Sequence, residues 1–149
     1  HYIKWARALF WNNRKTDLPD DIICEIAERC DCQPMYIQQF LFELWRVETI
    51  GREAIGQIEL EILKNRENEF MIIWDSLTVN QRKALRLLAE TGGENMYYAD
   101  VLQNFGLKSG SLLKRALTSL LSREVITKNR TYHIQDAMFR KWIQHLSRG

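Results

Sequence analysis

Residues 109–134, SGSLLKRALTSLLSREVITKNRTYHI, contain two patterns that decide the fold of the C-terminal half. Leucine and alanine recur at helical spacing in the first pattern, and Ser109 stands where the N-cap of that helix belongs. Two short β-prone runs follow, Val125–Thr127 and Thr131–Ile134, with a basic tripeptide between them. The stretch therefore predicts a helix that ends near Ser122, followed by a tight β-hairpin.

Further elements are predicted on both sides of this stretch. Thr78 and Gln81 have the spacing of a capping box, which predicts a helix that runs to about Thr91. Residues 96–98 predict a very short strand, residues 100–105 a short helix, and the last residues an amphipathic helix through Met138, Phe139, Trp142, Ile143 and Leu146. Helix, short strand, helix, turn, helix and hairpin is the order of a winged helix-turn-helix domain.

The helix that begins at Ser109 is the one that such a domain offers to the major groove of DNA. Its outward side carries small hydroxyls and cations and no acid, and the turn before it and the hairpin add more cations. Cations suit phosphate, and small hydroxyls allow a close approach to the backbone or to a base edge. We therefore predict DNA binding through Lys108, Ser111, Lys114, Arg115, Thr118, Lys128 and Arg130.

An alternative keeps the fold but changes the function. The same helix could be an ordinary solvated helix in a winged helix that serves as a protein–protein interaction or autoinhibitory module, without nucleic-acid binding. The fold alone does not decide between the two, because function depends on the site that a fold carries.

The charge of the chain is unevenly divided. Residues 1–77 hold 9 Lys and Arg against 14 Asp and Glu, a net charge of −5, whereas residues 78–149 hold 12 against 5, a net charge of +7. These sum to the +2 of the whole chain. An acidic N-terminal half and a basic C-terminal half indicate two modules with different partners.

The front half predicts three short helices. The first covers residues 2–11, the second begins near Pro19, and the third begins at Pro34. The second and third have apolar stripes at helical spacing, formed by Ile22, Ile26 and Cys30 and by Ile37, Phe40, Leu41, Leu44 and Trp45.

Residues 53–76 predict one longer connecting helix with an acidic exposed side. The fold class is therefore mainly α, with a small β-hairpin. We predict a helical lid-like module over 1–51, a connector helix over 52–77 and a winged-helix domain over 78–149.

Several classes of protein are disfavoured. No apolar run is long enough to span a membrane, and three cysteines without a pairing framework favour a reducing, cytoplasmic location. Cys30 and Cys32 lie close together, but the other Cys and His residues do not complete a zinc-binding pattern. We expect no metal site, no cofactor and no catalytic activity, because no nucleophile, base and acid have a recognisable spacing.

Two stretches of the sequence resemble a known family. The segment LPDDIICEIAERCDCQPMYIQQFLFELW is similar to the helical lid of prokaryotic AAA+ and STAND-type P-loop ATPases. The segment from Trp74 to Ile143 is similar to the winged helix that follows this lid, through Leu77, Thr78, Gln81, Arg82, Leu117, Leu120, Leu121, Asp136, Phe139 and Trp142.

The resemblance implies a role in a larger ATPase. Pro34 matches the family's G-x-P turn, where the lid contacts nucleotide, with Gln33 before it and Cys32 in place of the glycine. This sequence contains no G-x-x-x-x-G-K-[ST] run, so ATP and Mg²⁺ are implied for a longer parent protein, whose ATPase core is the expected partner. The chain begins with His1, so we expect it to be part of that longer protein.

The front half also predicts self-association. Trp5, Phe10 and Trp11 are apolar beyond what a three-helix core requires, and such a patch favours a homodimer. The alternative is that the helix over 53–76 folds back and covers these residues.

Overall fold

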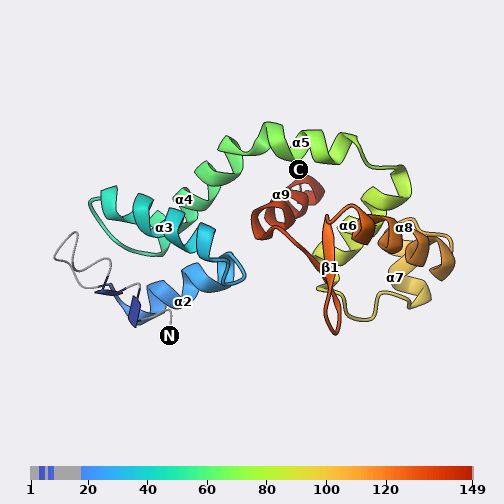
Figure 1. The fold of residues 1–149 in the computed structure, drawn as a ribbon, viewed down its shortest axis with the longest axis horizontal. Helices are drawn as coiled ribbons and strands as arrows, with labels where there is room; N and C mark the ends of the chain where they lie inside the picture. The colour runs from blue at the N-terminus through green and yellow to red at the C-terminus, as the bar shows by residue number, and fades with distance from the viewer. Residues whose placement is uncertain (1–3, 6, 9–17, 149) are drawn as a thin grey trace. The chain divides into compact units, whose positions relative to one another are not determined.

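A computed structural model describes residues 4, 5, 7, 8 and 18–148 of the chain (Figure 1). The chain divides into two compact units, His1–Lys64 and Asn65–Gly149. In the part that the structure describes, every helix is too short or too polar to cross a membrane. The class is the predicted one, helical with one small antiparallel hairpin.

The first unit contains three described helices, α2 (Asp20–Arg29), α3 (Pro34–Arg46) and α4 (Arg52–Asn65). Pro19 and Pro34 stand at the starts of α2 and α3, where a missing N–H costs nothing. Each helix buries one aliphatic or aromatic side, which includes Ile22, Ile26, Ile37, Phe40, Leu44, Ile55, Ile58 and Ile62.

Two expectations for this unit change. The sequence predicts Trp45 in the buried stripe of α3, but the residue is 43% exposed, because it lies at the edge of the stripe, about 100° around the helix from Leu44. The helix expected over residues 2–11 falls mostly outside the described residues, and Phe10 and Trp11 lie outside them entirely. Trp5 is described and is 40% exposed.

A charged contact ties α2 to α4. The guanidinium of Arg29 donates to Glu59 on α4 at 2.9 Å and to Glu25 on its own helix at 2.9 Å. Glu59 is only 7% exposed, so its charge needs this partner.

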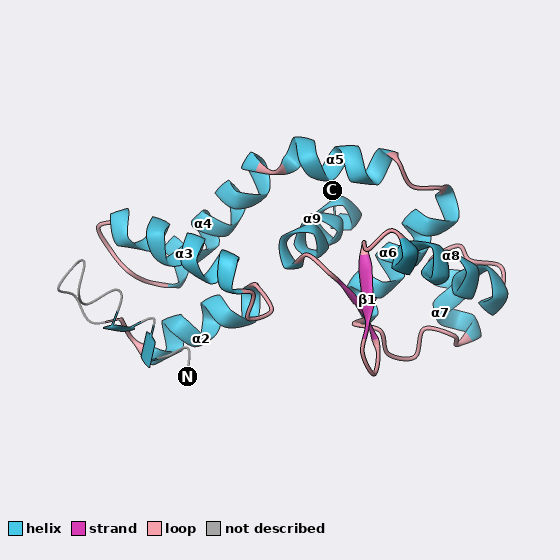
Figure 2. Ribbon diagram, in the orientation of Figure 1, coloured by secondary structure: helices cyan, strands magenta, loops and turns pink. Residues whose placement is uncertain are grey.

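The second unit contains the elements of the predicted winged helix (Figure 2). In chain order they are α5 (Glu67–Asp75), α6 (Val79–Thr91), α7 (Ala99–Asn104), α8 (Gly110–Ser122), β1 (Ile126–Lys128), β2 (Tyr132–Ile134) and α9 (Ala137–Arg148). The strands are antiparallel, with Ile126 opposite Ile134 and Lys128 opposite Tyr132. The capping box at Thr78 and Gln81 and the Ser109 cap of α8 are both present.

Two expected elements differ from the structure. The single helix expected over 53–76 is two helices, α4 and α5, which separate at Arg66, where the backbone has φ −99° and ψ 2°. Residues 96–98 form turns and bends and no strand. Met96 is buried there, whereas Tyr97 and Tyr98 are exposed. The apolar side chains of this segment therefore do not reflect pairing with another strand.

The core of the second unit is built around α6, which contacts α8, α9 and β2. Its apolar side, formed by Ala84, Leu85, Leu87, Leu88 and Ala89, is buried. Gln81 joins α6 to α8, because its side-chain amide donates to the Ser119 hydroxyl at 2.7 Å.

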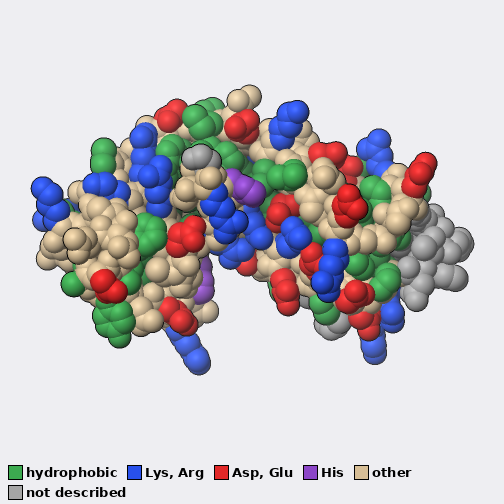
Figure 3. Space-filling model, turned by 180° about the vertical axis from the view of Figure 1, so that it is seen from behind, with side chains coloured by type: hydrophobic (Ala, Val, Ile, Leu, Met, Phe, Trp, Pro, Cys, Tyr) green, Lys and Arg blue, Asp and Glu red, His purple; other side chains and the backbone are tan. Residues whose placement is uncertain are grey.

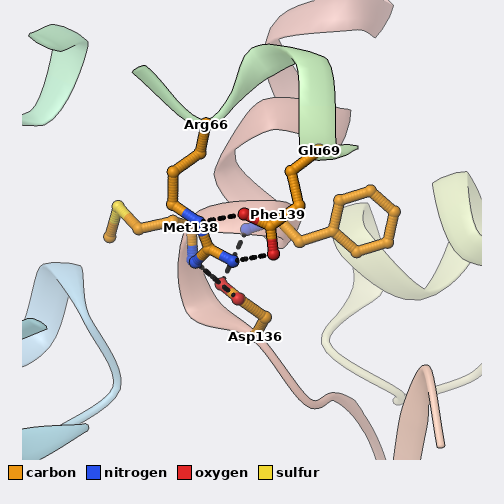
Figure 4. Close-up of polar contacts among 5 residues, drawn as sticks. All are labelled: Arg66, Glu69, Asp136, Met138 and Phe139. Atoms are coloured by element: carbon orange, nitrogen blue, oxygen red, sulfur yellow. Dashed lines mark hydrogen bonds and ion pairs between the residues drawn. The ribbon is translucent and has the colours of Figure 1, made fainter. Parts of the chain in front are cut away.

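A polar cluster joins the start of α5 to the start of α9 (Figure 4). One carboxylate oxygen of Asp136 accepts hydrogen bonds from the backbone N–H groups of Met138 and Phe139, at 2.9 and 3.0 Å, and so caps α9. The other accepts a hydrogen bond from Arg66 at 2.8 Å. Arg66 also binds both carboxylate oxygens of Glu69 and so lowers the pKa of that carboxyl.

An aromatic cluster continues the same contact into the core. The rings of Phe70 and Trp74 on α5 meet those of Phe139 and Trp142 on α9, with ring centroids 5.3 to 6.0 Å apart. Trp142 is 6% exposed, as the sequence predicted. Ring packing and the Arg66–Asp136 pair therefore hold the same two helices together.

We predict that Asp136→Ala destabilises the second unit by about 1–3 kcal/mol, because α9 loses its cap and Arg66 loses a partly buried partner. The matched variant Asp136→Asn keeps an oxygen that can cap α9 and loses only the charge, so its cost should stay below about 1 kcal/mol. Urea denaturation followed by circular dichroism measures both. Equal losses in the two variants would show that the cap contributes nothing.

Candidate nucleic-acid interface

One side of α8 is exposed along its whole length. Ser111, Lys114, Arg115, Thr118 and Ser122 all lie on this side, whereas Leu113, Ala116, Leu117 and Leu120 are buried on the opposite side. The helical period produces this division directly, because the two sets alternate at spacings of three and four. Figure 3 shows the molecule from behind the view of Figure 1, with Lys and Arg side chains interspersed among acidic and hydrophobic ones on that face.

Within the described part of the chain, the cations of this surface have no acidic partner. Among the residues that the structure describes, no carboxylate forms an ion pair with any of Lys108, Lys114, Arg115, Lys128 and Arg130. The sequence explains why, because residues 101–123 and 125–135 contain no Asp or Glu. We call these five cations, together with Ser111 and Thr118, the α8–hairpin surface.

Other cations of the second unit are used internally. Lys83 donates to the Gly106 carbonyl at 3.0 Å, and Arg82 donates to the Trp74 carbonyl at 2.9 Å. Arg123, at the end of α8, donates to the Ser76 hydroxyl at 2.6 Å. These side chains hold helices together, which separates them in role from the five cations of the α8–hairpin surface.

The hairpin carries one cation at the end of β1 and one in the connecting turn. Lys128 ends β1, and its ammonium lies 4.9 Å from the centroid of the Tyr132 ring on β2, a cation–π distance. Arg130 is exposed in the connecting turn. The Asn129 backbone N–H donates to the Thr131 carbonyl at 3.0 Å, which closes the turn.

Sequence reasoning missed an open hollow beside this surface. Its volume is about 570 Å³, and it lies between α7, the first turn of α8 and the loop before α7. Its lining includes Tyr97, Leu102, Gln103, Leu107 and Lys108. The adjacent tyrosines Tyr97 and Tyr98 are the only signal of the hollow in the sequence of this loop, and they also fit the strand predicted over residues 96–98.

Tyr97 is held in place by its neighbours. A Cβ built on Gly110 would lie 3.2 Å from Cδ1 of Tyr97, so the absence of a side chain at Gly110 lets the ring lie against the first turn of α8. Partial burial, with a smaller effect of the nearby Tyr132 hydroxyl, raises the pKa of Tyr97. A tyrosine hydroxyl is protonated at physiological pH even without this shift, so the side chain is neutral there.

The second predicted site, the corner at Gln33 and Pro34, lies in the first unit. Pro34 is the exposed first residue of α3, and Gln33 is its half-buried N-cap residue. The turn before it contains two left-handed residues that are not glycine, Asp31 with φ 51° and Cys32 with φ 56°. Cys32 therefore adopts the conformation that favours the glycine of the resembled turn.

The cysteines do not form a site. Within the described residues, no group of three or more Cys, His, Asp or Glu side chains is placed to hold a metal ion. Cys30 is buried, and its thiol donates to the Ile26 carbonyl at 2.9 Å, whereas Cys24 and Cys32 are exposed. Burial, with a smaller effect of Cys32, raises the pKa of Cys30 to about 11. Cys30 is therefore a neutral core residue at physiological pH.

Comparison with known proteins assigns the second unit to a protein family. Residues 68–145 match the family model described as a probable winged helix domain. This match covers more than half of the chain, so the chain belongs to that family. No curated protein sequence matches the chain.

The whole chain also resembles a solved structure. A Walker-type ATPase of Pyrococcus abyssi matches 95% of this chain with a TM-score of 0.73 and 20% sequence identity. The chain spans 40% of the length of that ATPase. The fold expected from the resemblance to a P-loop ATPase region is thus confirmed, for both units.

We predict that Cys32→Gly raises the free energy of unfolding by about 0.5–1 kcal/mol. Glycine removes the cost of a left-handed residue with a Cβ, about 1–2 kcal/mol, and the greater entropy of the unfolded glycine chain offsets part of this gain. Cys32→Ala keeps the Cβ and serves as the control, with an expected change near zero. Chemical denaturation measures both, and a Cys32→Gly variant no more stable than Cys32→Ala would contradict the prediction.

Proposed function

We propose that this chain is a non-catalytic regulatory part of a P-loop ATPase and that its winged helix binds duplex DNA through the α8–hairpin surface. The observation that carries the proposal is the set of five exposed cations on α8, the turn before it and the hairpin, which have no acidic partner among the residues that the structure describes. Phosphate groups are the ligands that such cations fit.

The shape of the surface supports duplex DNA among nucleic acids. An α-helix fits the major groove, and α8 presents Ser111, Lys114, Arg115 and Thr118 along one side of three turns. The Thr118 hydroxyl already donates to the Lys114 carbonyl at 2.9 Å, so it is left as an acceptor. The hairpin adds Lys128 and Arg130, which suit the neighbouring backbone phosphates.

The ATPase part of the proposal rests on the fold. The similarity to a Walker-type ATPase extends over both units, and the corner at Gln33 and Pro34 is where nucleotide contact is expected. We propose that ATP and Mg²⁺ bind an ATPase core in the longer protein and that the lid-like first unit of this chain reports the nucleotide state of the core to the winged helix. The core and duplex DNA are the proposed partners.

A protein-interaction role is the second candidate function. The observation that favours it is the exposed apolar side of α3, where Met35 is 61%, Phe42 57% and Trp45 43% exposed. Surfaces of this kind usually find a protein partner. They lie in the first unit, so this role and DNA binding by the second unit are compatible.

The test is a variant with four of the cations removed. Lys114, Arg115, Lys128 and Arg130 replaced by Ala should lower the affinity for a fluorescein-labelled duplex by at least about tenfold, because each lost phosphate contact weakens binding. All four are exposed, so the fold should be retained. Fluorescence anisotropy at low salt measures the affinity.

A charge-matched variant provides the control. Lys4, Arg46, Arg52 and Lys64 are exposed cations of the first unit, and their replacement by Ala changes the net charge by the same amount. This variant should bind the duplex almost as well as the wild type. Equal losses in the two variants would show that net charge alone governs binding, and the α8–hairpin surface would then have no specific role.

A further inference from the structure

The hollow between α7 and the first turn of α8 has the features of a small binding site. Its volume of about 570 Å³ is within the range of ligand pockets, roughly 300–1,000 Å³. Leu102 and Leu107 are buried and form apolar parts of its lining, whereas Gln103 and Lys108 are exposed and bring an amide and a cation. Apolar walls with few polar groups are typical of sites that hold a flat, partly polar ligand.

Tyr97 gives the hollow a stacking surface. Its side chain is 49% exposed, and the contact with the first turn of α8 at Gly110 holds the ring beside the hollow. Ala99 and Gly110 contribute almost no side chain to the lining, which keeps the ring accessible. A nucleobase can stack on an aromatic ring regardless of its identity, because every base has a π-face.

The charge around the hollow favours an anionic ligand, and the Tyr97 ring favours a nucleic acid among anionic ligands. Lys108 is both a lining residue of the hollow and a member of the α8–hairpin surface, so the two are continuous. None of the residues that line the hollow is acidic. A strand bound along α8 would therefore meet cations up to the edge of the hollow.

We propose that this hollow accepts an unpaired nucleobase next to the duplex bound by the α8–hairpin surface, with the base stacked on Tyr97 and its phosphate at Lys108. This proposal rests on the proposed function and adds a preference for DNA with a single-stranded extension. The Gln103 amide supplies a donor and an acceptor for the edge of the base.

The experiment compares three labelled DNAs with the whole chain. They are a blunt duplex, the same duplex with a short adenine extension, and the same duplex with an abasic extension of equal length. The abasic extension adds the same phosphates without bases, so the ratio of the two extension affinities isolates stacking. The wild type should bind the adenine extension about tenfold more tightly than the abasic one, as expected for one or more stacked bases.

Two tyrosine variants assign the effect to the hollow. Tyr97→Ala should reduce the ratio to about one and leave the affinity for the blunt duplex unchanged, because it removes no cation. Tyr98→Ala is the matched control, since Tyr98 is the adjacent tyrosine, is 62% exposed and does not line the hollow. It should keep the wild-type ratio.

A third variant covers the case in which Tyr97→Ala does not fold. Ala99→Leu places a larger, non-aromatic side chain at an exposed position of α7 that lines the hollow, and it should also remove the preference, because it fills space without adding a stacking surface. A wild type that binds the two extensions equally overturns the proposal, and so does a preference that survives in Tyr97→Ala or is lost equally in Tyr98→Ala. If the wild type does not bind the blunt duplex but still prefers the adenine extension to the abasic one, the proposed function is overturned and the proposal for the hollow is not.

Discussion

The contact between Arg66 and Asp136 is the interaction on which the arrangement of the second unit depends. Asp136 caps α9 with one oxygen and holds Arg66 with the other, and Arg66 stands where α4 gives way to α5. The pair thereby joins residues 70 positions apart in the chain and holds the start of α5 at the start of α9. Because α9 directly follows β2, the same contact also fixes where the hairpin leaves the core.

The packing of the second unit uses some of its cations as internal partners and leaves others exposed. Arg66, Arg82 and Arg123 each have a partner inside the second unit, and these contacts join α5 to α6, α8 and α9 or support α5 itself. Lys114 and Arg115 lie on the side of α8 that faces away from the core, in a stretch of sequence without acids. A surface of this kind costs little when the cations are solvated, and it is ready to exchange water and counterions for phosphate.

Much of the winged helix could be predicted from the sequence, because its signals are local. The capping box at Thr78, the Ser109 cap and the helical period of α8 depend on residues within a few positions of one another, and all are present in the structure. The seven predicted interface residues are likewise exposed. For the four on α8, the same period that buries Leu117 exposes Lys114. The predicted domain boundaries stay predictions.

What could not be predicted depends on distant partners. The helix break at Arg66 has no glycine or proline to mark it, and its partner Asp136 is far away in the sequence. Residues 96–98 have the composition of a strand, but they form turns and bends, and Tyr97 lies against Gly110 of α8. The hollow arises from this contact, so no local pattern indicated it.

The most direct measurement of the central claim is the salt dependence of duplex binding by the whole chain. If the five cations of the α8–hairpin surface each neutralise one phosphate, the logarithm of the association constant should fall linearly with the logarithm of the salt concentration, with a slope of about −4 to −5. A slope near zero, or no binding at low salt, would contradict the account, because an apolar docking surface hardly responds to salt.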